Sequence, residues 1–391
     1  MRTIRSIVAL AGLVPVLALT GSAGPALARP AGVSSAGARS QDRSASELGS
    51  PGFRVAVSRH YGQLVNASGY SVIIVTGRDT VWAFGGTNPG GPSLPVAARW
   101  NGRTMIASTL PRGLTGFITE ASAPAANDIW AASSYGRYLL HWDGARWALA
   151  RQWHSGVITD VDAVSARNVW VFGTSALGTA GTGTWHFNGR SWQRVRGLGA
   201  TIYRASAISR RDIWGISAGS NGDSVVRYTG RNWHRVRTAR ALDGIQLADI
   251  LAISPSDVWV LGDSQTHGAV RLVLVHWDGS KWSRLPSSVQ AWPGRLAPGP
   301  DGGVLISATP TNGAADGLIL RATTRGWRPM ITLRSPFGSG VSDIALMRST
   351  KSLWASGGVL NRVGGDAVIW EGPARWTTHR AAARWTGPDS T

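Results

Sequence analysis

Charged side chains recur at one position of a long repeat, and their types could do chemistry. The position lies ten or eleven residues before a regularly spaced residue, usually tryptophan, and holds Val72, Glu120, Asp160, Arg204, Asp249, Gly294 and Asp343. Four carboxylates facing one another would shift each other's pKa values and could hold a cation or a sugar. The alternative, which we favour, is that each repeated acid bonds the backbone of the next repeat. Arg204 breaks the acidic pattern and is the sharper functional candidate, or it neutralises its neighbours.

Signatures of catalysis and of metal or cofactor binding are scarce in the rest of the chain. His141, His186 and His276 share one repeat position, which indicates a structural role, and no two histidines have the His-x-x-x-His spacing of a metal site. No phosphate loop is present, and nothing marks a pair of opposed carboxylates suited to glycoside hydrolysis. We therefore assign no catalytic residue and no metal ligand, and we expect no cofactor.

The charged position belongs to a repeat of about 45 residues that runs from residue 70 to residue 380. Each copy has a short Ser/Asp/Asn turn, a tryptophan, a His-Trp-Asp-Gly-like motif and a further aromatic. The first tryptophan is present in six of the seven copies, as Trp82, Trp130, Trp170, Trp214, Trp259 and Trp354. In the sixth copy Val304 stands in its place. A period of this length is typical of a propeller or a solenoid.

The turn residues of each copy predict how its strands are connected. Asn-Gly or Asp-Gly between apolar runs predicts a tight hairpin in which both residues take positive φ. Each copy then contains four antiparallel strands, which we call a to d from first to last. The chain is predicted to be all-β, a seven-bladed β-propeller over residues 53–380 with four-stranded antiparallel blades. The repeated tryptophans would form the core between blades, and residues 53–58 could join the last sheet.

The clearest copy, residues 257–286, resembles a kelch repeat. Val258-Trp259-Val260-Leu261-Gly262 is followed by a loop, an aromatic residue, Asp278-Gly279 and Trp282. The other copies resemble kelch repeats weakly, because the expected glycine pair is often a single glycine. The resemblance implies a propeller like the central domain of galactose oxidase. The radical chemistry of such enzymes needs a Cys–Tyr crosslink, and this chain has no cysteine, so the resemblance supports the fold rather than that activity.

Loop lengths predict which face of the propeller binds a ligand. The a–b and c–d turns are short, whereas the b–c connections are predicted to be long and irregular: Gly85 to Ala97, Gly173 to Thr184, Gly262 to Leu272, Ala308 to Leu318 and Gly357 to Ala367. The d–a links emerge on the same face, and variable loops on a rigid scaffold usually carry binding sites. Trp153, His154 and Trp292 lie in such links. An exposed indole there could stack on a sugar ring; alternatively, each tryptophan is covered by its own loop.

Basic residues gather on the predicted outer strands. The formal net charge is +19, and Glu47, Glu120 and Glu371 are the only glutamates. Arg194 and Arg196 alternate along one outer strand, and Arg235 and Arg237 along the next, so each pair shares a face. This rim could bind a polyanion such as a wall phosphate polymer. The alternative, which we favour, is a solvated edge protected by charge. No recognition motif accompanies the charge, so we expect no nucleic-acid partner.

The ends of the chain predict secretion. Arg2, Arg5, an apolar stretch over residues 7–19 and Ala26-Leu27-Ala28 form a signal peptide over residues 1–28. Its apolar stretch is too short to remain as a membrane span. Residues 29–52 are predicted to be a disordered linker and residues 381–391 a tail. Without cysteine the chain has no disulfides and no lipid-modified cysteine anchor.

These observations lead to three hypotheses. The first is a secreted, monomeric, non-catalytic propeller that binds an extracellular glycan or protein on its loop face. The second is an extracellular carbohydrate-active hydrolase or lyase that uses the ring carboxylates and Arg204. The third is attachment to an anionic cell-wall polymer through the basic rim.

Overall fold

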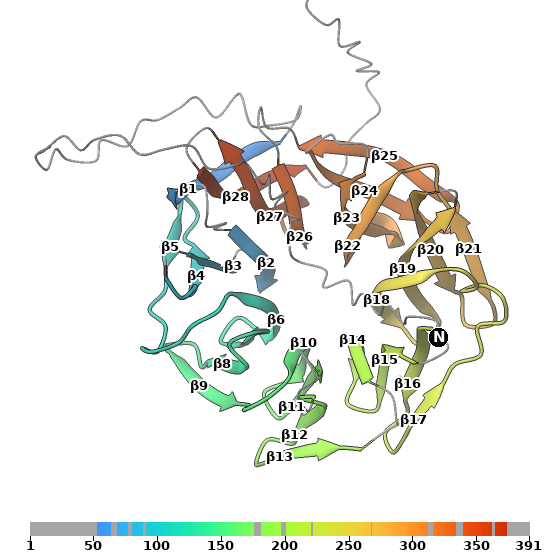
Figure 1. Cartoon of the computed structure of the whole chain (residues 1–391), viewed down its shortest axis with the longest axis horizontal. Coiled ribbons are helices and arrows are strands. Elements are labelled where there is room, and N and C mark those ends of the chain that lie inside the picture. Colours follow the sequence, from blue (N-terminus) through green and yellow to red (C-terminus); the bar gives the residue numbers. More distant parts are fainter. Residues whose placement is uncertain are drawn as a thin grey trace, which may run out of the picture.

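The computed structural model shows a propeller of seven sheets arranged around a central axis (Figure 1). It describes residues 53–63, 69–76, 80–88, 91–175, 181–196, 201–219, 222–266, 268–311, 316–333, 339–361 and 364–373. The predicted signal peptide (1–28), linker (29–52) and tail (381–391) lie outside these residues. Every sheet has four strands, and neighbouring strands are antiparallel. The predicted fold class is therefore confirmed.

Each of the first six blades is one continuous stretch of chain whose strands run from the channel outward. Blades one to three are β2 (Gly69–Thr76), β3 (Thr80–Thr87), β4 (Leu94–Trp100), β5 (Met105–Ala107); β6 (Ile118–Ala125), β7 (Asp128–Ser133), β8 (Tyr138–Trp142), β9 (Trp147–Gln152); and β10 (Val157–Ser165), β11 (Asn168–Thr174), β12 (Thr184–Phe187), β13 (Trp192–Val195). Blades four to six are β14 (Thr201–Ser209), β15 (Asp212–Ala218), β16 (Ser224–Tyr228), β17 (Trp233–Arg235); β18 (Gln246–Ser254), β19 (Asp257–Thr266), β20 (Ala269–Trp277), β21 (Trp282–Pro286); and β22 (Ala291–Pro298), β23 (Val304–Pro310), β24 (Gly317–Thr323), β25 (Gly326–Leu333).

Blade seven joins the two ends of the propeller. Its inner strands are β26 (Ser339–Met347), β27 (Ser352–Asn361) and β28 (Gly364–Pro373), and its outermost strand is β1 (Arg54–Gln63). Val57 pairs with Ile369, and Arg54 pairs with Glu371 both in register and through an ion pair. The N-terminal segment therefore closes the ring, which answers the question that the sequence left open about residues 53–58.

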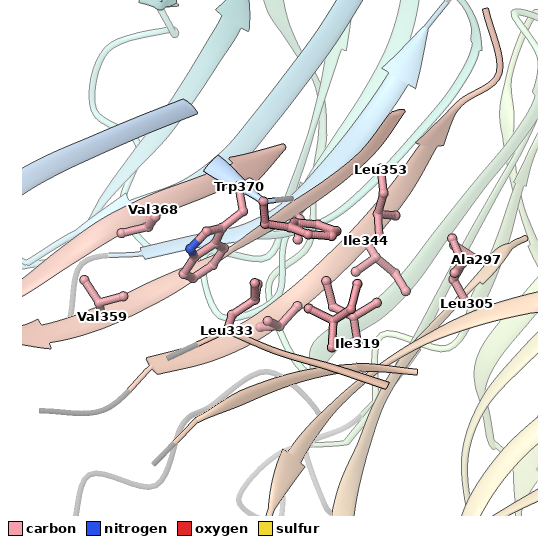
Figure 2. Close-up of a cluster of buried hydrophobic side chains, with 13 residues drawn as sticks. Ala297, Leu305, Ile319, Leu333, Ile344, Leu353, Val359, Val368 and Trp370 are labelled. Carbon is pink, nitrogen blue, oxygen red and sulfur yellow. The ribbon is translucent and has the colours of Figure 1, made fainter. Parts of the chain in front are cut away.

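The core lies between neighbouring blades, as predicted for the repeated tryptophans. Trp82 and Trp170 are 1% exposed, and the ring of Trp82 lies 5.1 Å from that of Trp142 in the next blade. Trp354 of blade seven packs 5.2 Å from Trp100 of blade one, so the same packing continues across the closure. Figure 2 shows the cluster between blades six and seven, where Ile319, Leu333, Ile344 and Trp370 gather.

Two predicted local features differ from the structure. The b–c connections of blades five and seven are extended hairpins, because the β19–β20 ladder continues to Thr266 and Ala269 and the β27–β28 ladder to Asn361 and Gly364. At the c–d turns only the glycine takes positive φ. In blade two Gly144 has φ +96°, while the Asp143 side chain accepts hydrogen bonds from the N–H groups of Ala145 and Arg146. A side-chain cap thus replaces the second positive φ.

Candidate functional site at the channel mouth

The charged repeat position lies on the innermost strands, near the end where each strand a enters from a d–a link. Register corrects one member of the predicted ring. In blade four Trp214 pairs with Arg227, and in blade six Leu305 pairs with Arg321. Leu305, rather than Val304, therefore occupies the tryptophan place, and the ring position ten residues earlier is Arg295 rather than Gly294. Without a tryptophan as a marker, the alignment of this copy slipped by one residue.

Three aspartates of the ring brace the neighbouring blade. Asp160 Oδ2 accepts a hydrogen bond of 2.8 Å from the Ala205 backbone N–H, which belongs to the next inner strand. The carboxylates of Asp249 and Asp343 make the same contact with the next blade, accepting hydrogen bonds from Leu296 N (2.7 Å) and Ile73 N (3.0 Å). Blades three, five and seven thus hold blades four, six and one. This geometry matches the structural alternative for the acidic ring.

The long side chains of the even-numbered blades meet across the channel. Arg204 Nη1 lies 3.1 Å from Glu120 Oε1 and also donates to the Thr159 carbonyl at 2.5 Å. Arg295 Nη2 lies 2.7 Å from Oε1 and 2.6 Å from Oε2 of Glu120. The Glu120 and Arg204 side chains are 8% and 7% exposed. One glutamate therefore joins two arginines from blades four and six.

Burial makes the aspartates hard to ionise. It raises the pKa of Asp160 to about 8, even though Arg204 favours the charged form. Burial raises the pKa of Asp343 to about 7 and also raises the pKa of Asp249. For Arg295, burial alone would lower the pKa, but Glu120, Asp249 and Asp343 outweigh it and the pKa is raised.

The charge of the ring therefore depends on proton occupancy. With the three aspartates neutral, Glu120 faces two arginines and the ring has one net positive charge; with all ionised, it has two net negative charges. Among the residues that the structure describes, no group of three or more His, Asp or Glu side chains is arranged to hold a metal ion. The ring chemistry is that of ion pairing and hydrogen bonding, with both arginines largely buried and paired with Glu120.

Of the two tryptophans predicted for the loop face, one is buried and one is exposed. Trp153 is 6% exposed and packs against Trp185 and Trp192, with the Arg151 guanidinium 5.2 Å from its ring. Trp153 is therefore covered rather than exposed to a ligand, in agreement with the alternative interpretation. His154 beside it is exposed. Trp292, near the start of β22 and on the same strand as Arg295, is 44% exposed.

The histidines of the repeat belong to a structural unit. In blade two Asp128 Oδ1 accepts hydrogen bonds from Trp130 Nε1 at 2.9 Å and from His141 Nε2 at 2.8 Å, and the two rings stack 4.2 Å apart. Asn168 holds Trp170 and His186 in the same way in blade three, and Asp257 holds Trp259 and His276 in blade five. The structural interpretation of these histidines agrees with these contacts.

One sequence match to a catalytic motif has no catalytic geometry. Residues 215–219 read Gly-Ile-Ser-Ala-Gly, the pattern of a hydrolase nucleophile elbow. An elbow requires a sharp turn from a strand into a helix, but Ser217 lies inside β15, pairs with Ser224 and is 1% exposed. The pattern is therefore part of an ordinary strand.

The predicted rim arginines all reach solvent. Arg194, Arg196, Arg235 and Arg237 are exposed on β13, on β17 or just after them. Arg235 Nη1 donates to Ser224 Oγ at 3.1 Å, and the described residues pair none of the four with a carboxylate. Within the described ranges, the chain contains no helix that is long and apolar enough to cross a bilayer.

Comparison with known proteins shows a fold and no family. No family model and no curated protein matches the chain. Three solved structures with the same fold are YCF48 bound to D1 peptide (14% identity, TM-score 0.55, covering 82% of this chain and 97% of that one), hydrazine synthase from Kuenenia stuttgartiensis (12%, 0.51, 73% and 92%), and a catalytically inactive virginiamycin B lyase from Staphylococcus aureus with quinupristin (9%, 0.52, 81% and 99%). At these identities the similarity establishes the propeller alone.

Proposed function

We propose that this protein is a secreted, non-catalytic propeller that binds an extracellular glycan or protein on the face formed by its b–c connections and d–a links. The observation that carries the proposal is Trp292, an indole that is 44% exposed on the same inner strand as Arg295. A rigid scaffold that presents an exposed aromatic side chain on the same strand as a largely buried arginine suits binding of a ligand with both apolar and polar groups. Two of the similar folds were solved with a peptide or with quinupristin.

The test is a binding screen of the full chain against a glycan array and extracellular proteins, followed by affinity measurement for whatever binds. Trp292→Ala should lower affinity about tenfold or more if the indole is a central contact. Leu149→Ala is the matched control, because Leu149 is 45% exposed but lies on outer strand β9. Equal affinities of both variants and the unsubstituted protein would refute the loop-face site. Trp153→Ala is unsuitable as a probe, since removing a buried tryptophan costs about 3–5 kcal/mol of stability.

A hydrolase or lyase finds little support in the ring. Asp160 and Asp249 already accept backbone hydrogen bonds from the next blade, and Glu120 is occupied by two arginines. Among the ring carboxylates, all of which the structure describes, no pair is left as a free acid and base.

Secretion and a kelch-like subtype belong to the same proposal. Sequencing the N-terminus of the mature protein should give a chain that begins after Ala28 if residues 1–28 are a cleaved signal. An intact Met1 would contradict secretion by this route.

A second candidate function is binding of a polyanion through the outer strands. It is favoured by the exposure of Arg194, Arg196, Arg235 and Arg237 without carboxylate partners among the described residues. Binding of this kind should fall steeply between low and high salt, because exposed charges are screened over about 10 Å at 0.1 M. Affinity for anionic polymers that is independent of salt would argue against it.

A further inference from the structure

A basic cavity with two indole walls lies at the rim between blades four and five, away from the channel. Its volume is about 450 Å³. One wall comes from the link between β17 and β18, which supplies Arg237 and Arg240; the other comes from the c–d hairpin of blade five, which supplies Lys281, Arg284, Trp277 and Trp282. Trp277 and Trp282 belong to the c–d hairpin of blade five, whereas the sequence predicts ligand binding in other connections. The repeat pattern alone therefore does not single out this place.

The backbone of the link is fixed by turns and by apolar packing. Consecutive turns run along it, with backbone hydrogen bonds from Ala241 N to Thr238 O at 3.0 Å and from Asp243 N to Arg240 O at 3.2 Å. Leu242 and Ile245 pack against the apolar cluster that also receives Trp277 and Trp282. The apolar residues of the link are thus anchored inward, while Arg237 and Arg240 are exposed.

The opposite wall is held by the c–d turn. Asp278 Oδ1 accepts hydrogen bonds from the backbone N–H groups of Ser280 and Lys281, both at 2.9 Å. The backbone bond from Lys281, followed by those from Ser280, lowers the pKa of Asp278 to about 2. This acid caps the turn and does not line the cavity. The turn therefore fixes the backbone of Lys281, whose side chain is exposed to solvent and lies within electrostatic reach of Asp278.

Four cations line this space, and the nearby acid Asp278 acts electrostatically on Lys281 from outside the lining. No carboxylate is among the lining residues, and the described part of the chain pairs none of Arg237, Arg240, Lys281 and Arg284 with one. Arg284 Nη1 donates to a backbone oxygen, the Asp243 carbonyl, at 3.0 Å. Like charges held on two firm walls repel one another, so an anionic group between them would be stabilised.

The indoles add a second kind of contact. Trp277 and Trp282 lie 5.5 Å apart with their planes 39° from parallel, and Trp277 Nε1 donates to the Pro255 carbonyl at 3.2 Å. Both rings are half-buried. A half-buried indole held in one orientation offers a flat apolar surface to a ring-shaped ligand at low entropic cost.

We propose that this cavity binds a segment of an acidic polysaccharide, with the charged groups against Arg237, Arg240, Lys281 and Arg284 and a sugar ring against Trp277. A sugar that bears carboxylate, sulfate or phosphate groups supplies the anion and the ring in one unit. For its ligand charge this inference rests on the second candidate function, and it is independent of the loop-face site at Trp292.

The experiment measures affinity of the full-length secreted chain for four probes: a heparin octasaccharide, a polygalacturonate oligomer, polyphosphate and single-stranded DNA. Lys281→Glu and Arg240→Glu should each weaken binding of the two acidic glycans about tenfold or more. Arg146→Glu is the matched control, because Arg146 occupies the repeat position of Lys281 in the c–d turn of blade two and makes the same change in net charge. It should change affinity less than about twofold.

The outcomes separate the cavity from the wider rim. Equal losses for Lys281→Glu and Arg146→Glu would overturn the cavity and leave general polyanion binding standing. No binding of any polyanion by the unsubstituted chain would remove both. Trp277→Leu, checked for an unchanged unfolding midpoint, should weaken the glycans but leave polyphosphate unaffected; equal effects on both would overturn the sugar contact. Tighter binding of single-stranded DNA than of either glycan would overturn the ligand class.

Discussion

Glu120 is the residue on which the centre of the molecule depends. It comes from blade two, yet its carboxylate contacts arginines from blades four and six. A glutamate and two arginines buried at a channel mouth are costly to desolvate and are retained only if their charges remain paired. The three ring aspartates solve the same problem differently, by accepting backbone N–H groups and by resisting ionisation.

Removing the shared carboxylate should destabilise the propeller. Glu120→Ala leaves Arg204 and Arg295 buried with no glutamate between them, and we expect a loss of about 3–5 kcal/mol in the free energy of unfolding. Urea denaturation provides the measurement. Glu371→Ala is the control, since Glu371 pairs with the exposed Arg54 and should cost about 1 kcal/mol or less. Similar losses in the two variants would mean that the central network adds little to stability.

Stability should also fall as pH rises from about 4 to about 8. An unfolded aspartate titrates near its ordinary pKa of about 3.9, whereas burial raises the pKa of Asp160 to about 8 and that of Asp343 to about 7. In this window the folded state binds more protons than the unfolded state, so deprotonation favours unfolding.

The measurement is the free energy of unfolding at pH 5 and pH 8.5. Asp160→Asn should reduce the difference by at least about 1 kcal/mol, because a neutral amide cannot ionise. Asp143→Asn is the control: hydrogen bonds from Arg146 and Ala145 lower the pKa of Asp143, so its titration lies below this window. A pH dependence that is identical in Asp160→Asn and the unsubstituted protein would contradict the raised pKa.

At the scale of elements, strands b and c are joined by more than their backbone ladder. An acid or amide at the start of strand b holds the tryptophan of that strand and the histidine of strand c with one oxygen. Because that oxygen only accepts, each histidine must donate from Nε2. In blade four Arg227 replaces histidine and pairs with Asp212 through two contacts of 2.7 Å while lying 4.7 Å from the Trp214 ring.

This unit can be tested in blade two. Asp128→Ala removes the acceptor of both Trp130 and His141 and should cost about 1–3 kcal/mol, because buried donors are left unsatisfied. Asp128→Asn should be nearly neutral, since blade three uses Asn168 in the same place. Thermal unfolding of the two variants provides the measurement. An Asn variant as unstable as the Ala variant would show that the charge, rather than the acceptor, matters.

At the scale of the molecule, the ring closes through a strand from the other end of the chain. β1 pairs with β28, and Phe53 and Val57 are buried against blade seven or blade one. Without β1, the edge of β28 would be left open to pair with another chain. Closure therefore protects both the edge and the two flanking cores.

Two shortened chains test this closure. A chain that begins at Phe53 should unfold cooperatively, whereas one that begins at Gly69 loses β1 and the burial of Phe53 and Val57, worth about 3–6 kcal/mol. The second chain should unfold at a lower temperature and aggregate. Calorimetry with light scattering compares them. Equal midpoints and equal solubility would mean that blade seven does not need its fourth strand.

Although the fourth strand of blade seven is β1 from the other end of the chain, the amino-acid sequence predicts the number of blades, the four strands of each of the first six, the burial of the repeated tryptophans and the structural role of His141, His186 and His276. These features follow from short-range patterns, because alternation, turn residues and a fixed period act within one blade of about 45 residues.

Which side chains meet depends on how the blades are arranged around the axis. Strand register assigns Arg295 to the ring, because blade six lacks the tryptophan that marks the repeat in the sequence. The burial of Trp153, the contact of Glu120 with two distant blades and the basic cavity at Lys281 depend on how separate blades face one another. The contact between Glu120 and Arg295 joins residues 175 positions apart. A pattern confined to one repeat holds no information about a partner in another blade, because the closed ring sets which blades face one another.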